Sequence, residues 1–240
     1  MFLNFDVIDK ITNKDFTENK IYPYVNIRNI LHDTFYEDLR KTLPDINNFK
    51  KAEGVARNYG QNPHNRYGYG GWTDKNLKIS TSWKKFIKEL KSNRYKKFLS
   101  RLFGTENFAI RFMWHYATKN QSVSPHFDSP RKLGSHIFYF NDENWNPSWG
   151  GQTTLYFDEK NKISKKSNPS PKDFDSFFSS EISKNCSLIF KNTDKSWHGV
   201  SPLECPEGIY RKVFILVIEN ENKFEKFKRI FTGYPFRDVI

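Results

Sequence analysis

The chain has 240 residues, 37% of them hydrophobic and 17% aromatic, which is enough apolar material for one sizeable core and excludes a disordered tail protein. Basic residues outnumber acidic ones by 39 to 27, giving a net charge of +12, but the lysines are spread along the whole chain. We interpret this excess mainly as a solubilising surface, because no single basic run marks a binding patch.

Nothing in the sequence indicates a membrane or an export signal. The mean hydropathy is −0.78, and no stretch approaches the roughly 18 to 20 apolar residues that a membrane span needs. The first ten residues carry acidic groups and Asn, unlike the basic start of a secretory signal. We therefore expect a cytoplasmic protein without membrane contacts, while its oligomeric state is left open.

Residues 1–107 are expected to form a layer of strand and helix. Residues 1–20 are polar and mixed, which predicts a frayed arm or an edge strand, and 22–27 have the pattern of a strand. Apolar residues at helical spacing predict helices at about 33–43, 82–91 and 94–103. Residues 52–76 are rich in Gly, Asn, Tyr and Arg and predict a long loop, with candidate substrate-facing residues Arg66, Tyr67, Tyr69 and Trp72.

The residue pattern of the chain changes at residue 108. Short runs rich in β-branched and aromatic residues predict strands at 108–116, 136–140, 153–157, 187–190 and 212–219. Because no helical pattern separates them, an antiparallel sandwich or barrel is favoured over a parallel sheet. The polar segment 159–176 is expected to be a loop. We predict one α+β domain over 1–240, with a β-barrel core at 108–219 and a C-terminal extension at 220–240.

Two separated motifs carry candidate metal ligands. His126 and Asp128 are two positions apart, so in a strand their side chains would point to the same face. His198, about 70 residues downstream, would complete two imidazoles and one carboxylate. This set leaves adjacent coordination positions open and suits non-haem Fe(II), although a catalytic zinc ion also accepts it.

A third feature of the sequence, Arg211, bears on the choice between Fe(II) and zinc. Arg211 begins the apolar run 211–219, and strand alternation places it on the same face as Val213, Ile215 and Val217. A buried guanidinium needs an anion to neutralise it, and its planar fork matches a carboxylate. A dicarboxylate that chelates the metal and also meets this cation fits both features, and 2-oxoglutarate has that shape.

At this point the chain resembles the prolyl 4-hydroxylase-like branch of the Fe(II)/2-oxoglutarate dioxygenases. The resemblance extends from about residue 22 to 219. Besides His126, Asp128, His198 and Arg211, it rests on the segments 138–142, 145–151, 154–157 and 197–200. It implies a double-stranded β-helix, a jelly-roll or cupin-like barrel, with the N-terminal helices packed on one sheet.

The resemblance also implies roles for single residues. His126, Asp128 and His198 would be the iron ligands, and Arg211 would bind the distal carboxylate of 2-oxoglutarate, with Lys212 as the alternative if the register slips by one residue. Tyr116 and Tyr139 would contact the cosubstrate. His115 is interpreted as structural, because alternation turns it away from the face of Tyr116.

The expected activity is an Fe(II)-, 2-oxoglutarate- and O2-dependent hydroxylation that releases succinate and CO2. The substrate would be a protein side chain, such as a prolyl residue, or a small metabolite. A nucleic-acid demethylase is disfavoured, because such relatives carry a second Arg six positions after the first and Val217 stands there. A barrel that binds a ligand without turnover is disfavoured by the intact set of four site residues.

Overall fold

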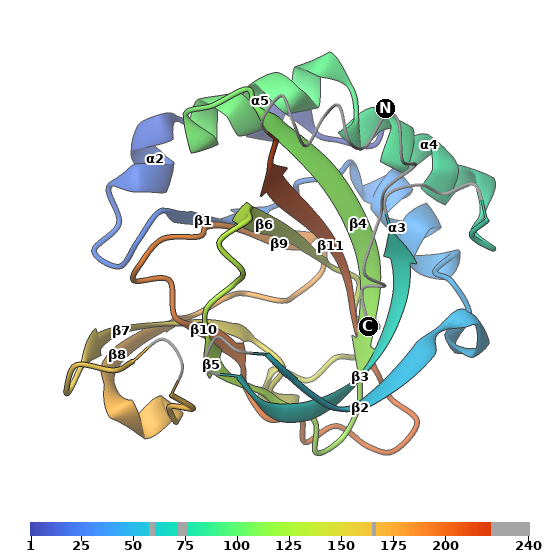
Figure 1. Cartoon of the computed structure of the whole chain (residues 1–240). Helices are drawn as coiled ribbons and strands as arrows, with labels where there is room; N and C mark the ends of the chain where they lie inside the picture. The colour runs from blue at the N-terminus through green and yellow to red at the C-terminus, as the bar shows by residue number, and fades with distance from the viewer. Residues whose placement is uncertain (58–60, 72–75, 165–166, 222–240) are drawn as a thin grey trace.

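A computed structural model describes residues 1–57, 61–71, 76–164 and 167–221. Nearly all of the expected extension at 220–240, and Trp72, lie outside these residues. The core of the molecule is formed by two antiparallel sheets that face each other (Figure 1).

The larger sheet contains seven strands. In spatial order they are β1 (Tyr24–Arg28), β9 (Cys186–Lys191), β6 (Lys132–Tyr139), β11 (Arg211–Asn220), β4 (Phe108–Ala117), β3 (Gln61–Gly71) and β2 (Lys50–Arg57). The smaller sheet contains β5 (Val123–His126), β10 (His198–Val200), β7 (Thr153–Glu159) and β8 (Phe174–Ser179). Strands distant in the sequence alternate in both sheets, which is the arrangement of the expected double-stranded β-helix.

Helices cover the outer face of the larger sheet, as expected (Figure 1). They are α1 (Phe5–Ile8), α2 (Asn13–Thr17), α3 (Asp33–Lys41), α4 (Thr81–Leu90) and α5 (Asn93–Phe103). Short 3-10 turns occur at Ile46–Asn48, Pro147–Trp149 and Pro171–Asp173. The two longest helices begin at serines, because the hydroxyls of Ser80 and Ser92 accept hydrogen bonds from backbone N–H groups in the first turn.

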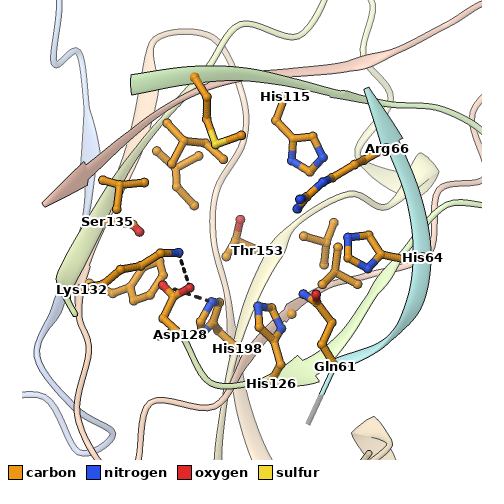
Figure 2. A pocket seen from close by; sticks show the side chains of 18 of the residues that line it. Gln61, His64, Arg66, His115, His126, Asp128, Lys132, Ser135, Thr153 and His198 are labelled. Carbon is orange, nitrogen blue, oxygen red and sulfur yellow. Dashed lines mark hydrogen bonds and ion pairs between the residues drawn. The ribbon is translucent and has the colours of Figure 1, made fainter. Parts of the chain in front are cut away.

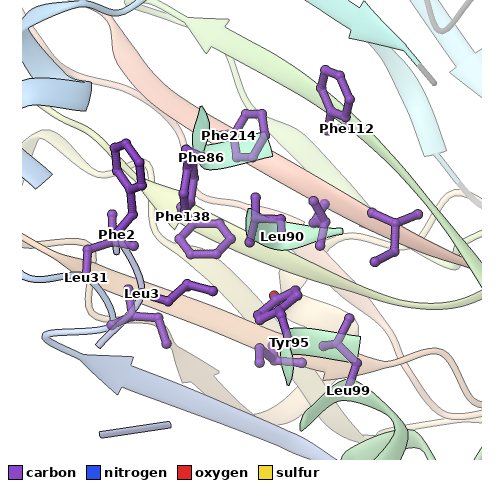
Figure 3. Packing of buried hydrophobic residues seen from close by; sticks show 14 of the residues in the cluster. Phe2, Leu3, Leu31, Phe86, Leu90, Tyr95, Leu99, Phe112, Phe138 and Phe214 are labelled. Atoms are coloured by element: carbon purple, nitrogen blue, oxygen red, sulfur yellow. The ribbon is translucent and has the colours of Figure 1, made fainter. Parts of the chain in front are cut away.

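Alternation along the strands separates an aromatic core from a polar interior. On β11, Phe214, Leu216 and Ile218 pack under the helices against rings such as Phe86. Figure 3 shows this layer, in which residues of α4 and α5 meet those of β4, β6 and β11. The opposite face of the same strands points between the two sheets. One face of each strand therefore holds the fold together while the other is available for a site.

The N-terminus is neither the frayed arm nor the edge strand that its composition predicted, because it contains two short helices and only an isolated bridge between Leu3 and Leu31. Phe2, Leu3 and Phe5 are buried in the main core. The carboxylate of Glu89 on α4 accepts hydrogen bonds from the backbone N–H groups of Phe2 at 2.8 Å and Leu3 at 2.9 Å. This prediction was wrong because the partner that holds the segment lies more than eighty residues away in the sequence.

Two predicted loops also contain strands. Residues 52–76 are largely the β2–β3 hairpin, and the segment 159–176 includes the last residue of β7 and the start of β8. The sequence concealed β3 because many of its side chains are polar on both faces, as in its first residues Gln61, Asn62 and His64. Among the described residues, no helix is long and apolar enough to cross a membrane.

Asn185 provides a test of how the N-terminal segment is held. It has a left-handed backbone (φ 56°) and is buried. Its side chain bonds both backbone groups of Leu31, at 3.0 and 2.7 Å, and the carboxylate of Asp33 at 2.9 Å. Because Asn185→Ala leaves buried backbone groups unpaired, we expect it to lower the free energy of unfolding by about 3 kcal/mol.

The matched control is Asn29→Ala, since Asn29 has nearly the same backbone (φ 54°) but is exposed. It should cost about 1 kcal/mol, the penalty of the left-handed conformation alone. Urea denaturation of both variants measures the difference, and equal losses would contradict the role given to the Asn185 side chain.

Candidate active site

The two motifs with candidate metal ligands meet where β5 and β10 pair. His126 ends β5 and lies directly opposite His198, the first residue of β10, while Asp128 follows two residues after His126. The imidazole rings are 4.4 Å apart between centroids, and Nε2 of His198 is 3.8 Å from Oδ2 of Asp128. One potential ligand atom from each of these three buried side chains lies within 4.8 Å of the other two.

Backbone carbonyls orient both imidazoles. Nδ1 of His126 donates to the carbonyl of Ser124, and Nδ1 of His198 donates to that of Ser196, each at 2.9 Å. With the proton on Nδ1, each Nε2 keeps its lone pair. Burial, together with the neighbouring His198, lowers the pKa of His126 well below its ordinary value, so this imidazole is neutral.

The carboxylate of Asp128 is held in its ionised form. Burial alone would raise its pKa, but the Lys132 ammonium and the two imidazoles outweigh that effect and bring the pKa below its usual value. Lys132 donates to Oδ1, and Oδ2 faces His198. The side chain therefore offers one oxygen on the side of the imidazoles, and the set of two imidazoles and one carboxylate suits a divalent metal ion.

These groups line a cavity between the two sheets. Its empty volume, including the solvent at its mouth, is about 740 Å³. Figure 2 shows His126, Asp128 and His198 on one side, with Arg66 and His115 entering from β3 and β4 on the other. The wall formed by β3 closes the space between the sheets, since the backbone N–H of Asn62 donates to the hydroxyl of Ser124 at 2.8 Å.

Arg211 lies in the same cavity, and only 3% of its surface is exposed. Its Nε donates to the carbonyl of Gly151 at 2.5 Å, and Nη2 donates to the hydroxyl of Thr153 at 3.1 Å. Neither partner is an acid, and no carboxylate among the described residues pairs with Arg211. A buried guanidinium without an acidic partner is costly, and an anion beside it would stabilise it.

The Gly150-Gly151 pair permits the contact with Arg211. Both residues have positive φ angles, of 75° and 79°. A Cβ on Gly150 would lie 2.0 Å from the carbonyl oxygen of Pro202, and one on Gly151 would lie 3.0 Å from Cδ of Arg211. Only glycine fits at these positions, so the turn before β7 depends on both.

The two tyrosines predicted to contact a cosubstrate lie in different places. The hydroxyl of Tyr139 donates to Thr153 at 2.9 Å and bonds Ser180 at 2.8 Å, and the Arg211 guanidinium carbon is 5.6 Å from the ring centre. Tyr116 instead packs in the core under the helices, where its hydroxyl donates to the carbonyl of Pro44 at 3.1 Å. The expectation that Tyr116 contacts the cosubstrate is therefore wrong.

The sequence assigned Tyr116 to the wrong face of β4. On β4, Arg111, Met113 and His115 line the cavity, and the even-numbered residues face the helices. His115, interpreted from the sequence as turned away, therefore lies in the cavity. Because both faces of this strand are buried, its hydrophobic pattern does not show which residues face the cavity and which face the helices. The charged Arg111 was the one residue on the strand that indicated the cavity face.

The structure also shows where the remaining candidate site residues lie. Lys212, the alternative to Arg211, points away from the cavity, and its Nζ lies 2.8 Å from Oδ1 of Asp142. Of the proposed lid residues, Arg66 lines the cavity, while Tyr67 and Tyr69 pack against the main core. Polar residues that the sequence did not mark as site candidates also line the cavity, among them Gln61, His64, Arg111, Lys132, Ser135 and Thr153.

Comparison with known proteins agrees with this geometry. The profile of the 2OG-Fe(II) oxygenase superfamily matches residues 112–218, which include the three candidate ligands and Arg211. No curated protein sequence matches the chain.

Solved structures with a similar fold include two prolyl hydroxylases. A prolyl hydroxylase from Trichoplax adhaerens, in complex with a hypoxia inducible factor oxygen degradation domain peptide fragment, has a TM-score of 0.60 and 17% identity, covering 92% of this chain and 90% of that one. A Pseudomonas putida prolyl-4-hydroxylase has a TM-score of 0.57 and 12% identity, covering 82% and 92%. Residues 112–218 therefore match the 2OG-Fe(II) oxygenase superfamily, whose reagents are Fe(II), 2-oxoglutarate and O2, and the chain has a prolyl 4-hydroxylase-like fold.

Proposed function

We propose that the protein is an Fe(II)- and 2-oxoglutarate-dependent hydroxylase in which His126, Asp128 and His198 hold the iron and Arg211 binds the distal carboxylate of 2-oxoglutarate. The observation that carries the proposal is the meeting of this triad and a buried guanidinium in one cavity. The bound iron, cosubstrate and O2 supply the oxidative chemistry, in which 2-oxoglutarate becomes succinate and CO2 and a substrate C–H bond becomes C–OH.

The residues of the chain supply orientation, charge and shelter from water. The carbonyls of Ser124 and Ser196 aim the two Nε2 atoms, and Lys132 occupies the oxygen of Asp128 that faces away from them. Arg211, which is held by hydrogen bonds to Gly151 and Thr153, would bind and position the distal carboxylate of 2-oxoglutarate. Tyr139 supports this arrangement through its hydrogen bond to Thr153.

The presence of Asp128 supports hydroxylation as the outcome. In the related halogenases, a small residue at this position leaves room for a halide on the metal. Here a buried, ionised carboxylate fills that place. Both a protein side chain, such as prolyl, and a small metabolite remain candidate substrates.

The first test concerns metal binding. His126→Ala and Asp128→Ala each remove one ligand atom, so we expect Co(II) or anaerobic Fe(II) affinity to fall by about a hundredfold or more. His115→Ala is the matched control, because it removes an imidazole from the same cavity outside the triad. Calorimetric titration measures the affinities, and wild-type binding by either ligand variant would remove the metal assignment.

The second test concerns the cosubstrate. Arg211→Ala should raise the dissociation constant for 2-oxoglutarate by about a hundredfold, because it removes a buried charged partner. Lys212→Ala, the neighbour that points outward, should change it less than about twofold. The metal-to-ligand charge-transfer band of the anaerobic Fe(II) complex reports 2-oxoglutarate binding. If the two variants bind 2-oxoglutarate equally well, the role given to Arg211 is wrong.

A further inference from the structure

Lys132 lies beside the candidate metal ligands without being one of them. It begins β6, lines the cavity and donates to Oδ1 of Asp128, a contact that Figure 2 marks. Only 10% of the Lys132 side chain and 4% of the Asp128 side chain are exposed. An ammonium this close to a cation site repels a metal ion and so would weaken metal binding. The contact is therefore not explained by metal affinity alone.

The turn that carries Lys132 is held in place by several hydrogen bonds. The backbone N–H of Lys132 donates to the carbonyl of Ser129 at 2.9 Å. Nδ2 of Asn192 donates to the carbonyls of Ser129 at 3.1 Å and Lys132 at 3.0 Å. Oδ1 of Asn192 accepts from the hydroxyl of Ser196 at 3.0 Å, and the carbonyl of Ser196 orients His198. One amide side chain thus connects this turn to the residue that aims an imidazole.

The two oxygens of Asp128 have different surroundings. Oδ1 accepts from Lys132, while Oδ2 lies 3.8 Å from Nε2 of His198. A carboxylate can bind a metal ion through one oxygen or through both. Because a charge-assisted hydrogen bond is strong and its donor here is itself positive, the ammonium competes with a metal ion for Oδ1. Only Oδ2 is then left as a ligand atom.

The number of ligand atoms from Asp128 bears on the reaction with O2. An octahedral ion offers six positions. His126, His198 and one oxygen of Asp128 would fill three of them, and a chelating 2-oxoglutarate would fill two, which leaves one for O2. If Asp128 bound through both oxygens, 2-oxoglutarate would still bind, but the position for O2 would be filled.

We propose that Lys132 is a positioning residue that keeps Asp128 a one-oxygen ligand and so reserves a coordination position for O2. This proposal rests on the proposed function. Lys132 acts through Asp128, by holding Oδ1 on the side away from the imidazoles. Its charge would lower the affinity for the metal ion, and its benefit would be an open position beside the bound cosubstrate.

The test replaces Lys132 by Met, which removes the ammonium and keeps the length of the side chain. In Lys132→Met, we expect Fe(II) and 2-oxoglutarate to bind within about threefold of wild type or more tightly, because Oδ1 becomes available and the like charge is gone. Nitric oxide, an analogue of O2, should bind the anaerobic Fe(II)–2-oxoglutarate complex about tenfold or more weakly. The charge-transfer band reports 2-oxoglutarate, and electron paramagnetic resonance reports nitric oxide.

Two further variants make the result specific. Lys132→Arg should restore most of the nitric oxide binding, because the guanidinium keeps a charged donor for Oδ1. Lys212→Met is the matched control, because Lys212 also pairs with a carboxylate, Asp142 at 2.8 Å, but points away from the cavity. It should leave the binding of Fe(II), 2-oxoglutarate and nitric oxide unchanged.

A second measurement applies to the wild-type protein itself. Infrared difference spectra between the metal-free and Co(II)-loaded protein, with isotope-labelled aspartate, follow the two carboxylate stretching bands. These bands lie further apart for a carboxylate that binds through one oxygen than for one that binds through both. We expect the one-oxygen pattern in the wild-type protein and the two-oxygen pattern in Lys132→Met.

The outcomes separate this proposal from the proposed function. Failure of the wild-type protein to bind Fe(II) or 2-oxoglutarate would refute the function itself. Normal loading with the two-oxygen pattern in the wild-type protein would overturn the role of Lys132 alone, and so would wild-type nitric oxide binding in Lys132→Met. Parallel loss of Fe(II), 2-oxoglutarate and nitric oxide binding in that variant would show a merely structural role and would also overturn it.

Discussion

The pairing of β5 with β10 is the contact on which the site depends. It sets His126 directly opposite His198, and the carbonyls two residues before each histidine fix the ring orientation. Gly199 allows this close approach, because a Cβ there would lie 2.5 Å from the carbonyl oxygen of Val123. Strand β10 has only three residues and also pairs with β7 on its other side, while the buried ring of Trp197 packs beside it. The relative position of the two histidines is therefore set within the smaller sheet, and Lys132 of β6 holds Asp128 beside them.

The larger sheet supplies the opposite wall of the cavity. Each central strand carries aromatic residues under the helices and polar residues toward the cavity, and a shift of one residue would exchange them. On β11 such a shift would move Arg211 into the core beneath α4 and bring Lys212 into the cavity. The aromatic packing of Phe214 against Trp83 and Phe86 opposes this exchange. The hydrophobic core thus determines which cation faces the cavity.

Much of the fold and of the candidate site was predictable from the sequence, and the predictions that were wrong share a cause. The sequence singled out His126, Asp128, His198 and Arg211 because the two motifs and the arginine at the start of an apolar strand fit one chemistry together and resemble a known family. Tyr116 was assigned to the wrong face because β4 is buried on both faces. Its sequence therefore does not alternate between hydrophobic and polar residues in a way that distinguishes the two faces. The strand β3 was taken for a loop because its polar residues line a cavity instead of a solvent face. Phe2 and Leu3 looked frayed because their partner, Glu89, is distant in the chain.

The cavity residues that the sequence concealed lie on the two strands whose character it hid. Arg66 comes from β3, whose sequence is typical of a loop, and Arg111 comes from β4, which is buried on both faces. The charge of Arg111 is matched within the fold, because Glu219 accepts a hydrogen bond from its Nε at 2.9 Å. Arg211 has no acidic partner among the described residues, and its hydrogen bonds go to a carbonyl and a hydroxyl. Because a buried guanidinium without an anion is costly, the burial of Arg211 is explained best by an anion that enters the cavity.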